Sequence, residues 1–210
     1  MDIHNIYSIG RSCDTDFLLN NMYIRAYSSP FSWMFIDLET ALYFIENRFE
    51  GFTDAVKKGG DTAFFHRYFA NDEADDRICK WTHHDMSNND TKTAMQRRGE
   101  RLIEDIYSPH TLLVYYDFRY RSIEYYTDLL LPFTGKYGCK VLVIAQPENK
   151  TAPLDILFKS EELCLVSLGR QGNLQAVLKY LYSFKILPKK TTITEPENIL
   201  PIVNPNIILS

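Results

Sequence analysis

The sequence predicts a single α/β domain with a mostly parallel, Rossmann-like sheet flanked by helices. Three nearly continuous apolar segments, 111–117, 139–146 and 162–169, alternate with segments of helical periodicity. Such strands are typical of a parallel sheet that is covered on both faces. A length of 210 residues is enough for one domain with a sizeable core. We expect the domain to span residues 1–185 and to be followed by a proline-containing C-terminal extension, 186–210.

The first expected elements are a strand and a helix. Residues 4–9 are apolar enough to form a strand that ends at Gly10. Residues 14–26 have helical periodicity, and Ser12 and Asp14 are both suitable N-caps for this helix. Its spacing predicts an inward face made of Phe17, Leu18, Met22 and Ile24.

A loop and a second helix follow. Residues 28–35 contain serines and a proline, which favour a loop, although their aromatic residues argue against full exposure. Residues 37–49 predict a helix that is capped by Asp37. Its apolar stripe is formed by Leu38, Leu42, Ile45 and Phe49. The segment 51–90 is the least regular, and only a short strand over 78–86 is expected there, carrying His83 and His84.

The remaining elements alternate between helices and strands. Residues 91–107 predict a helix with one face formed by Met95, Arg98, Leu102 and Ile106. After it we expect strands over 111–117, 139–146 and 162–169, and helices over 121–134 and 173–185.

The composition excludes several classes of protein. The net charge of −4 argues against a general nucleic-acid binder. No apolar stretch is long enough to span a membrane, and the N-terminus has no secretory pattern, so we expect a cytoplasmic protein. The four cysteines are widely spaced and are expected to be free thiols. No cofactor is predicted, and the sequence does not determine the oligomeric state.

Cys13 is the first candidate for chemistry. It lies in the stretch YSIGRSCDTDF, directly before the first predicted helix. A thiol at a helix start lies among unpaired backbone N–H groups, which favour the thiolate and hence a nucleophile with a lowered pKa. The same geometry at Gly10, Arg11 and Ser12 suits a bound phosphate. The third interpretation is a small buried residue with no chemical role.

The pair His83-His84 and the neighbouring Asp85 are the next candidates. A thiol nucleophile needs a base, and His84 is a suitable partner for Cys13. Asp85 is the other candidate for acid–base chemistry, although it cannot easily orient its own neighbour. A third catalytic member would come from elsewhere, and the candidates are Asp14, Asp16 and Asp117. The spacing predicts no metal site, and the acidic run 72–76 is typical of a solvated loop.

A basic group follows the histidines. Arg97, Arg98 and Arg101 suit contacts with phosphate or carboxylate groups, or they form a solvated helix face paired with nearby glutamates. In a parallel sheet the segment 10–13 and the loops after Asp117 and Gln146 meet at one edge. These residues could therefore bind a nucleotide or a nucleotide-sugar.

Several motifs together resemble a known family. YSIGRSC, the segment from SSPFSW to RFEGF, THHDM and QRRGERLIEDI occur in order before the strand TLLVYYD. They resemble the family of putative papain-like cysteine peptidases, a domain of unknown function. The resemblance covers roughly residues 5–150 and implies Cys13 as nucleophile and His84 as base. The chain departs from the family pattern at Ser12, Ser32 and Met86, where that pattern has Asn, Asp and Phe.

The resemblance and the residue pattern imply different sheets. A papain-like fold has an antiparallel sheet, whereas the alternation of strands and helices predicts a parallel one. Three functions therefore stay open. The first is a thiol-dependent hydrolase or acyl-transfer enzyme that acts on a peptide or small molecule. The second is a glycosyltransferase with a nucleotide-sugar donor, and the third is a non-catalytic interaction module.

Overall fold

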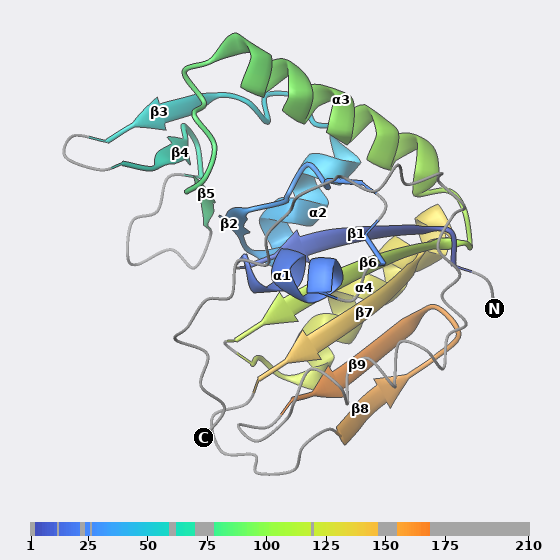
Figure 1. Cartoon of the computed structure of the whole chain (residues 1–210). Coiled ribbons are helices and arrows are strands. Elements are labelled where there is room, and N and C mark those ends of the chain that lie inside the picture. The colour runs from blue at the N-terminus through green and yellow to red at the C-terminus, as the bar shows by residue number, and fades with distance from the viewer. Residues whose placement is uncertain are drawn as a thin grey trace.

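The computed structural model describes residues 3–11, 13–21, 24–25, 27–58, 62–69, 78–118, 120–146 and 155–168. Its main feature is a five-stranded sheet with the order β1-β6-β7-β9-β8 (Figure 1). The strands are β1 (Asn5–Gly10), β6 (Thr111–Asp117), β7 (Lys140–Ala145), β9 (Leu163–Ser167) and β8 (Asp155–Lys159). The first four are parallel, and β8 pairs with β9 in the antiparallel sense. The predicted α/β fold with a mostly parallel sheet is confirmed.

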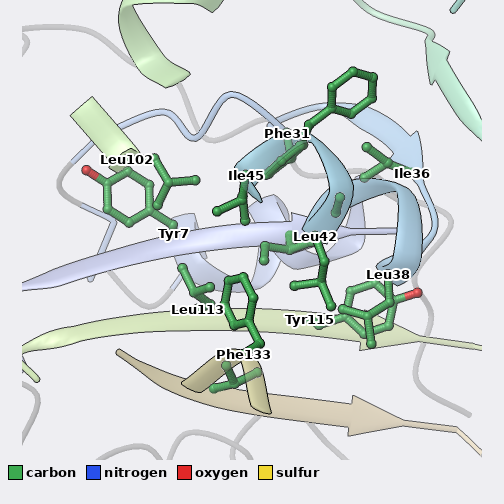
Figure 2. Packing of buried hydrophobic residues seen from close by; sticks show 14 of the residues in the cluster. Tyr7, Phe31, Ile36, Leu38, Leu42, Ile45, Leu102, Leu113, Tyr115 and Phe133 are labelled. Atoms are coloured by element: carbon green, nitrogen blue, oxygen red, sulfur yellow. The ribbon is translucent and has the colours of Figure 1, made fainter. Parts of the chain in front are cut away.

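Alternate side chains of the strands enter two cores on opposite faces of this sheet. Leu112 and Val114 pack with Leu18 and Leu19 of α1 (Asp14–Asn21) on one face. Leu113 and Tyr115 belong to the larger core, which also contains residues of the other three helices. Figure 2 shows Leu42, Ile45, Leu102 and Phe133 gathered around these strand residues. Coverage of both faces explains why the strands are apolar at nearly every position.

The other helices are α2 (Leu38–Glu46), α3 (Asn89–Asp105) and α4 (Ile123–Tyr137), each with a capping side chain. The predicted cap Asp37 is confirmed, since its Oδ1 accepts from the backbone N–H of Thr40 at 2.9 Å. Asn88 and Ser122 cap α3 and α4. α4 ends at Gly138, whose φ of 79° is the left-handed conformation that favours glycine.

A second sheet lies at one end of the molecule (Figure 1). It is antiparallel, with the order β2-β5-β4-β3, and each strand has three residues. The strands are β2 (Met34–Ile36), β5 (Cys79–Trp81), β4 (Phe64–His66) and β3 (Ala55–Lys57). Rings of Phe44, Phe52, His66 and Trp81 pack edge to face or tilted beside it. The sequence predicted only one of these strands, because three-residue strands show too little periodicity.

Three expectations about local structure are corrected. α1 ends at Asn21, earlier than residue 26. Phe17 does not face inward: its side chain is 50% exposed and its ring stacks edge-on against Trp33. The strand expected over 78–86 ends at Trp81, so His83 and His84 follow it outside the strand, His83 in a bend and His84 directly after it.

Other expectations are confirmed or lie outside the described residues. All four cysteines are free thiols, as expected. No helix among the described residues is long and apolar enough to cross a membrane. The acidic run 72–76, the helix expected over 173–185 and the extension 186–210 lie outside the described residues.

Candidate functional site

Cys13 lies between the end of β1 and the start of α1 and is the most accessible thiol of the chain. It is half-buried, whereas Cys79, Cys139 and Cys164 are buried. Burial raises the pKa of the Cys13 thiol above its ordinary value. The Thr82 hydroxyl opposes this shift, and the nearby carboxylates of Asp14 and Asp16 add to it. The expectation that the helix start lowers this pKa is therefore wrong, because burial and two acidic groups outweigh the backbone N–H groups.

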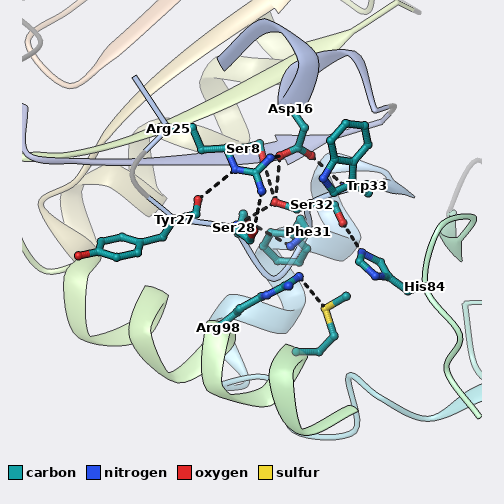
Figure 3. A network of polar contacts seen from close by, with 12 residues as sticks. Ser8, Asp16, Arg25, Tyr27, Ser28, Phe31, Ser32, Trp33, His84 and Arg98 are labelled. Carbon is teal, nitrogen blue, oxygen red and sulfur yellow. Dashed lines mark hydrogen bonds and ion pairs between the residues drawn. The ribbon is translucent and has the colours of Figure 1, made fainter. Parts of the chain in front are cut away.

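The buried carboxylate of Asp16, on α1, is the centre of a polar network (Figure 3). Its Oδ1 accepts from Ser8 Oγ at 2.9 Å, Ser32 Oγ at 2.9 Å and Arg25 Nη1 at 3.0 Å. Its Oδ2 accepts from the backbone N–H of Trp33 at 2.8 Å. Four donors hold this charge inside the protein, so Asp16 fixes the loop 28–33 against β1 and α1.

The residues Ser32 and Trp33 connect this network to the segment 82–84. The Ser32 carbonyl accepts from His84 Nε2 at 2.8 Å, and the Trp33 carbonyl accepts from Thr82 Oγ1 at 3.4 Å. Trp33 has a φ of 62°, a conformation that is costly for a bulky residue. The contacts of Trp33 N with Asp16 and of its ring with Phe17 and His83 hold it there.

His84 is held in one tautomer by this arrangement. A carbonyl oxygen only accepts, so His84 Nε2 carries the proton that it donates to Ser32. The neutral ring therefore has its lone pair on Nδ1. Burial is the main cause that lowers the pKa of His84, with a smaller effect from the nearby Arg98 and His83 side chains, and it outweighs the Ser32 hydrogen bond and Asp16. His84 is thus a neutral base near pH 7, and no direct hydrogen bond joins it to Cys13 in the described structure.

Three arginines, Arg25, Arg98 and Arg101, form what we call the arginine cluster. Arg25 pairs with Asp16 at 3.0 Å and donates to Ser28 Oγ at 2.5 Å. Arg101, on α3, donates to the Ser28 carbonyl at 2.8 Å and lies over the Tyr27 ring at 4.5 Å. Burial and the nearby charges of Arg25, Arg101 and Arg97 lower the pKa of Arg98. Two members of the cluster, Arg25 and Arg101, thus contact Ser28 in the same loop whose Ser32 carbonyl accepts from His84.

A family model matches residues 4–129, which include the whole polar network. The family is described as "putative papain-like cysteine peptidase" and is a domain of unknown function. The chain belongs to this family. No curated protein and no solved structure matches the chain. In this family member the larger sheet is mostly parallel, as the residue pattern predicted, and the antiparallel sheet is the smaller one.

The other predicted site residues lie in different surroundings. Arg11 is buried at the end of β1, with Nη1 3.9 Å from Asp117 Oδ1. Asp117 also accepts from the Tyr126 hydroxyl at 3.0 Å. Gly10 pairs with Tyr116, and Asp117 with Ala145, so the strand ends meet at one edge of the sheet, as expected. These contacts favour a structural ion pair for Arg11 and Asp117.

Asp85 and Arg97 are exposed, and the structure does not bring either into the network. Asp85 accepts from the backbone and hydroxyl of Ser87 at 3.0 and 2.6 Å, and these bonds lower its pKa. Ser12 lies outside the described residues. Within the described ranges no group of His, Cys, Asp and Glu is arranged to hold a metal ion.

Sequence reasoning missed three members of the site: Arg25, Trp33 and Thr82. Their roles depend on contacts with residues 9 to 49 positions away, such as Arg25 with Asp16 and Thr82 with Trp33. The aromatic residues of the loop 28–35 were the one available signal, because they indicated partial burial. Asp16 was among the candidates for a third catalytic member, and its position in the first turn of α1 gave no reason to prefer it.

Proposed function

We propose that this family member is a thiol-dependent hydrolase or acyl-transfer enzyme in which Cys13 is the nucleophile and His84 the base. The observation that carries the proposal is the 2.8 Å hydrogen bond from His84 Nε2 to the Ser32 carbonyl. It fixes the proton on Nε2 and leaves the Nδ1 lone pair to accept a proton. Asp16 is a positioning residue, since it holds Ser32 through its hydroxyl.

The two pKa shifts support a neutral resting pair. The pKa of Cys13 is raised and that of His84 is lowered, so thiol and imidazole are both uncharged near pH 7. The proton then moves when the substrate is bound, which is general-base catalysis rather than attack by a preformed thiolate. Nδ1 must also reach the sulfur when an electrophile is bound, a small one such as iodoacetamide included, since catalytic hydrogen bonds tighten in such complexes.

The proposed reaction has two steps. Cys13 Sγ attacks the substrate carbonyl carbon while His84 Nδ1 takes the thiol proton, and the carbonyl oxygen becomes an oxyanion. Backbone N–H groups in the first turn of α1 are the donors proposed to stabilise it. The intermediate expels an amine or alcohol, which receives the proton from His84, and leaves a thioester on Cys13. Water or another acceptor, activated by His84, releases the acyl group and restores the thiol.

The rate of alkylation by iodoacetamide against pH tests the pair. We expect His84→Ala to slow alkylation of Cys13 near neutral pH by roughly one to two orders of magnitude. His83→Ala is the comparison variant: it removes an exposed neighbour that meets the edge of Trp33 and influences the pKa of His84, but it leaves the His84 ring in place. We therefore expect a much smaller change in rate than for His84→Ala. Cys13→Ala gives the background from the three buried thiols. Equal rates in wild type and His84→Ala would refute the pair.

A second candidate function is a glycosyltransferase with a nucleotide-sugar donor. The ends of β1, β6 and β7 meet at one edge of a mostly parallel sheet, where such folds bind nucleotides. This enzyme would not need the thiol, so Cys13→Ser should retain transfer from a nucleotide-sugar. The hydrolase should lose its activity with the same variant. Absence of both activities in the wild type, with no stabilisation by any nucleotide or sugar, would point to the non-catalytic module.

A further inference from the structure

We infer that the arginine cluster binds an oxyanion, and that in the proposed enzyme this is a carboxylate of an acidic peptide substrate. The identity of the site as a substrate subsite rests on the proposed function, whereas anion binding itself does not. Three observations carry the inference: the cluster has more positive charge than its surroundings neutralise, one of its guanidinium groups has no anionic partner, and it adjoins the loop that holds His84.

Ion pairs leave part of the cluster's charge unmatched among the described residues, since Asp105, which accepts from the Tyr7 hydroxyl near Arg101, forms no ion pair with that arginine. Asp16 is the carboxylate that pairs with the cluster, through Arg25. Both oxygens of Asp16 already accept hydrogen bonds, three at Oδ1 and one at Oδ2. Asp16 is therefore occupied by Arg25 and by neutral donors. Arg98 and Arg101, the other two members, form no ion pair with Asp16 in the described structure, and arginine is always charged.

Arg98 is the member with the weakest polar contact. It is half-buried on α3, and its one hydrogen-bonding contact in the described structure is from Nη1 to the Met95 sulfur at 3.8 Å. A thioether is a weak acceptor, so a charged donor gains little from it. Figure 3 shows the Arg98 side chain reaching from α3 toward the loop that carries Phe31. A half-buried guanidinium in this position has its planar set of donors available for an oxyanion.

Arg101 is held in place, but not all of its hydrogen-bond donors have an acceptor. Its Nη2 donates to the Ser28 carbonyl, and its guanidinium lies over the Tyr27 ring. Its Nε is buried and makes no hydrogen bond in the described structure. Because Nε is closed to solvent, a ligand would act on Arg101 through the charge of the whole guanidinium, by compensating it. The fixed position of Arg101 also means that little side-chain freedom is lost on binding.

The cluster lies close to the proposed catalytic pair. Arg98 is among the charges that lower the pKa of His84, and Asp16 influences Cys13, His84 and Arg98 alike. The loop 28–32 accepts from Arg101 at Ser28 and from His84 at Ser32. Arg98 thus acts on His84, and a substrate group that extends past His84 would approach Arg98. A negatively charged group there would relieve the repulsion among the arginines.

The first experiment measures binding of small anions by thermal shift at constant ionic strength, with chloride as reference. We expect succinate to raise the Tm of the wild type and to have little effect on Arg98→Gln. Arg97→Gln is the matched control, since it makes the same change at the adjacent exposed residue of α3, and it should respond like the wild type. An equal response of Arg98→Gln and Arg97→Gln would overturn the inference.

A second arm separates a carboxylate from a phosphate ligand. Uridine diphosphate and pyrophosphate are titrated in the same assay beside succinate. Stronger stabilisation by succinate, lost in Arg98→Gln, supports the acidic peptide. Stronger stabilisation by the diphosphates, lost in the same variant, overturns that assignment and favours a nucleotide-sugar donor at this cluster.

A third measurement connects the cluster to the thiol without a known substrate. Iodoacetate and iodoacetamide alkylate the same sulfur, and only the former carries a carboxylate. We expect the ratio of the two rates to fall by about tenfold in Arg98→Gln and to stay unchanged in Arg97→Gln. The ratio cancels changes in thiol reactivity, so it reports on anion binding alone. If His84→Ala leaves both rates unchanged while Arg98→Gln lowers the ratio, the anion site stands and the catalytic pair fails.

Discussion

The parallel sheet and the irregular segment 27–88, taken without its helix α2, follow different physical rules. Strands β1, β6, β7 and β9 are held by apolar side chains on both faces, and every residue of β1, β7 and β9 is buried. The irregular segment contains three-residue strands, a residue with positive φ at Trp33 and a network of buried polar groups. The sheet supplies the stability and the framework, whereas the segment 27–88 supplies His84 and most of the loop that holds it.

Two substitutions with similar expected losses of unfolding free energy, one in the sheet and one in the polar network, test whether framework and site are separate. Leu113→Ala removes a fully buried side chain from β6 and should lower the free energy of unfolding by about 2–5 kcal/mol. Asp16→Asn breaks the buried pair with Arg25 and should cost about 3–5 kcal/mol. Chemical denaturation measures both.

Cys13 alkylation should then distinguish the two variants. We expect Asp16→Asn to change the pH profile of alkylation under conditions where the protein is folded, because Ser32 and Trp33 lose their anchor. Leu113→Ala should keep the wild-type profile. A changed profile in Leu113→Ala, or an unchanged one in Asp16→Asn, would show that framework and site are not separable in this way.

Two helix glycines test the same comparison with smaller expected changes in stability. A Cβ at Gly99 on α3 would lie 2.7 Å from Phe49 Cγ, in the irregular segment, so Gly99→Ala should destabilise by about 1–3 kcal/mol. A Cβ at Gly135 on α4 would meet nothing within 4 Å, and Gly135→Ala should stabilise by about 0.5–1 kcal/mol. Thermal denaturation of both variants measures the two signs, and a stabilising Gly99→Ala would mean that Phe49 can move aside.

The same division explains what the sequence could predict. The strand over 111–117 was predicted with its observed bounds, because a buried parallel strand is apolar throughout and is short enough to be bounded clearly. The helix cap at Asp37 was predicted because its signal is local. Cys13 and His84 were proposed from motifs, and their roles stay predictions.

The residues that hold Cys13, His84 and Asp16 in place have no local sequence pattern that could have predicted them. The acceptor of His84 is a backbone carbonyl 52 residues away, and any residue type at position 32 supplies such a carbonyl. Arg25 and Trp33 reach Asp16 across 9 and 17 residues, through a loop with no regular period. The raised pKa of Cys13 was also unpredictable, because it depends first on burial.

The smallest expected effect is a change in how the free energy of unfolding depends on acidic pH. Burial lowers the pKa of His84 below its ordinary value of about 6.5, so the unfolded chain binds this proton more readily than the folded one. The resulting stability is fully present above about pH 6.5 and is lost as the pH falls through the lowered pKa of the folded protein. His66, whose pKa is lowered by burial as well, adds to the same trend.

His84→Gln should therefore reduce the acid sensitivity without abolishing it. We expect the fall in unfolding free energy between pH 7 and pH 5 to be smaller than in the wild type by about 1 kcal/mol or less, since His84 is only half-buried. Gly135→Ala is the control, because it lies in open space and should keep the wild-type dependence. An equal or steeper fall in His84→Gln would mean that His84 is not held neutral in the folded state, which would remove the base from the proposed pair.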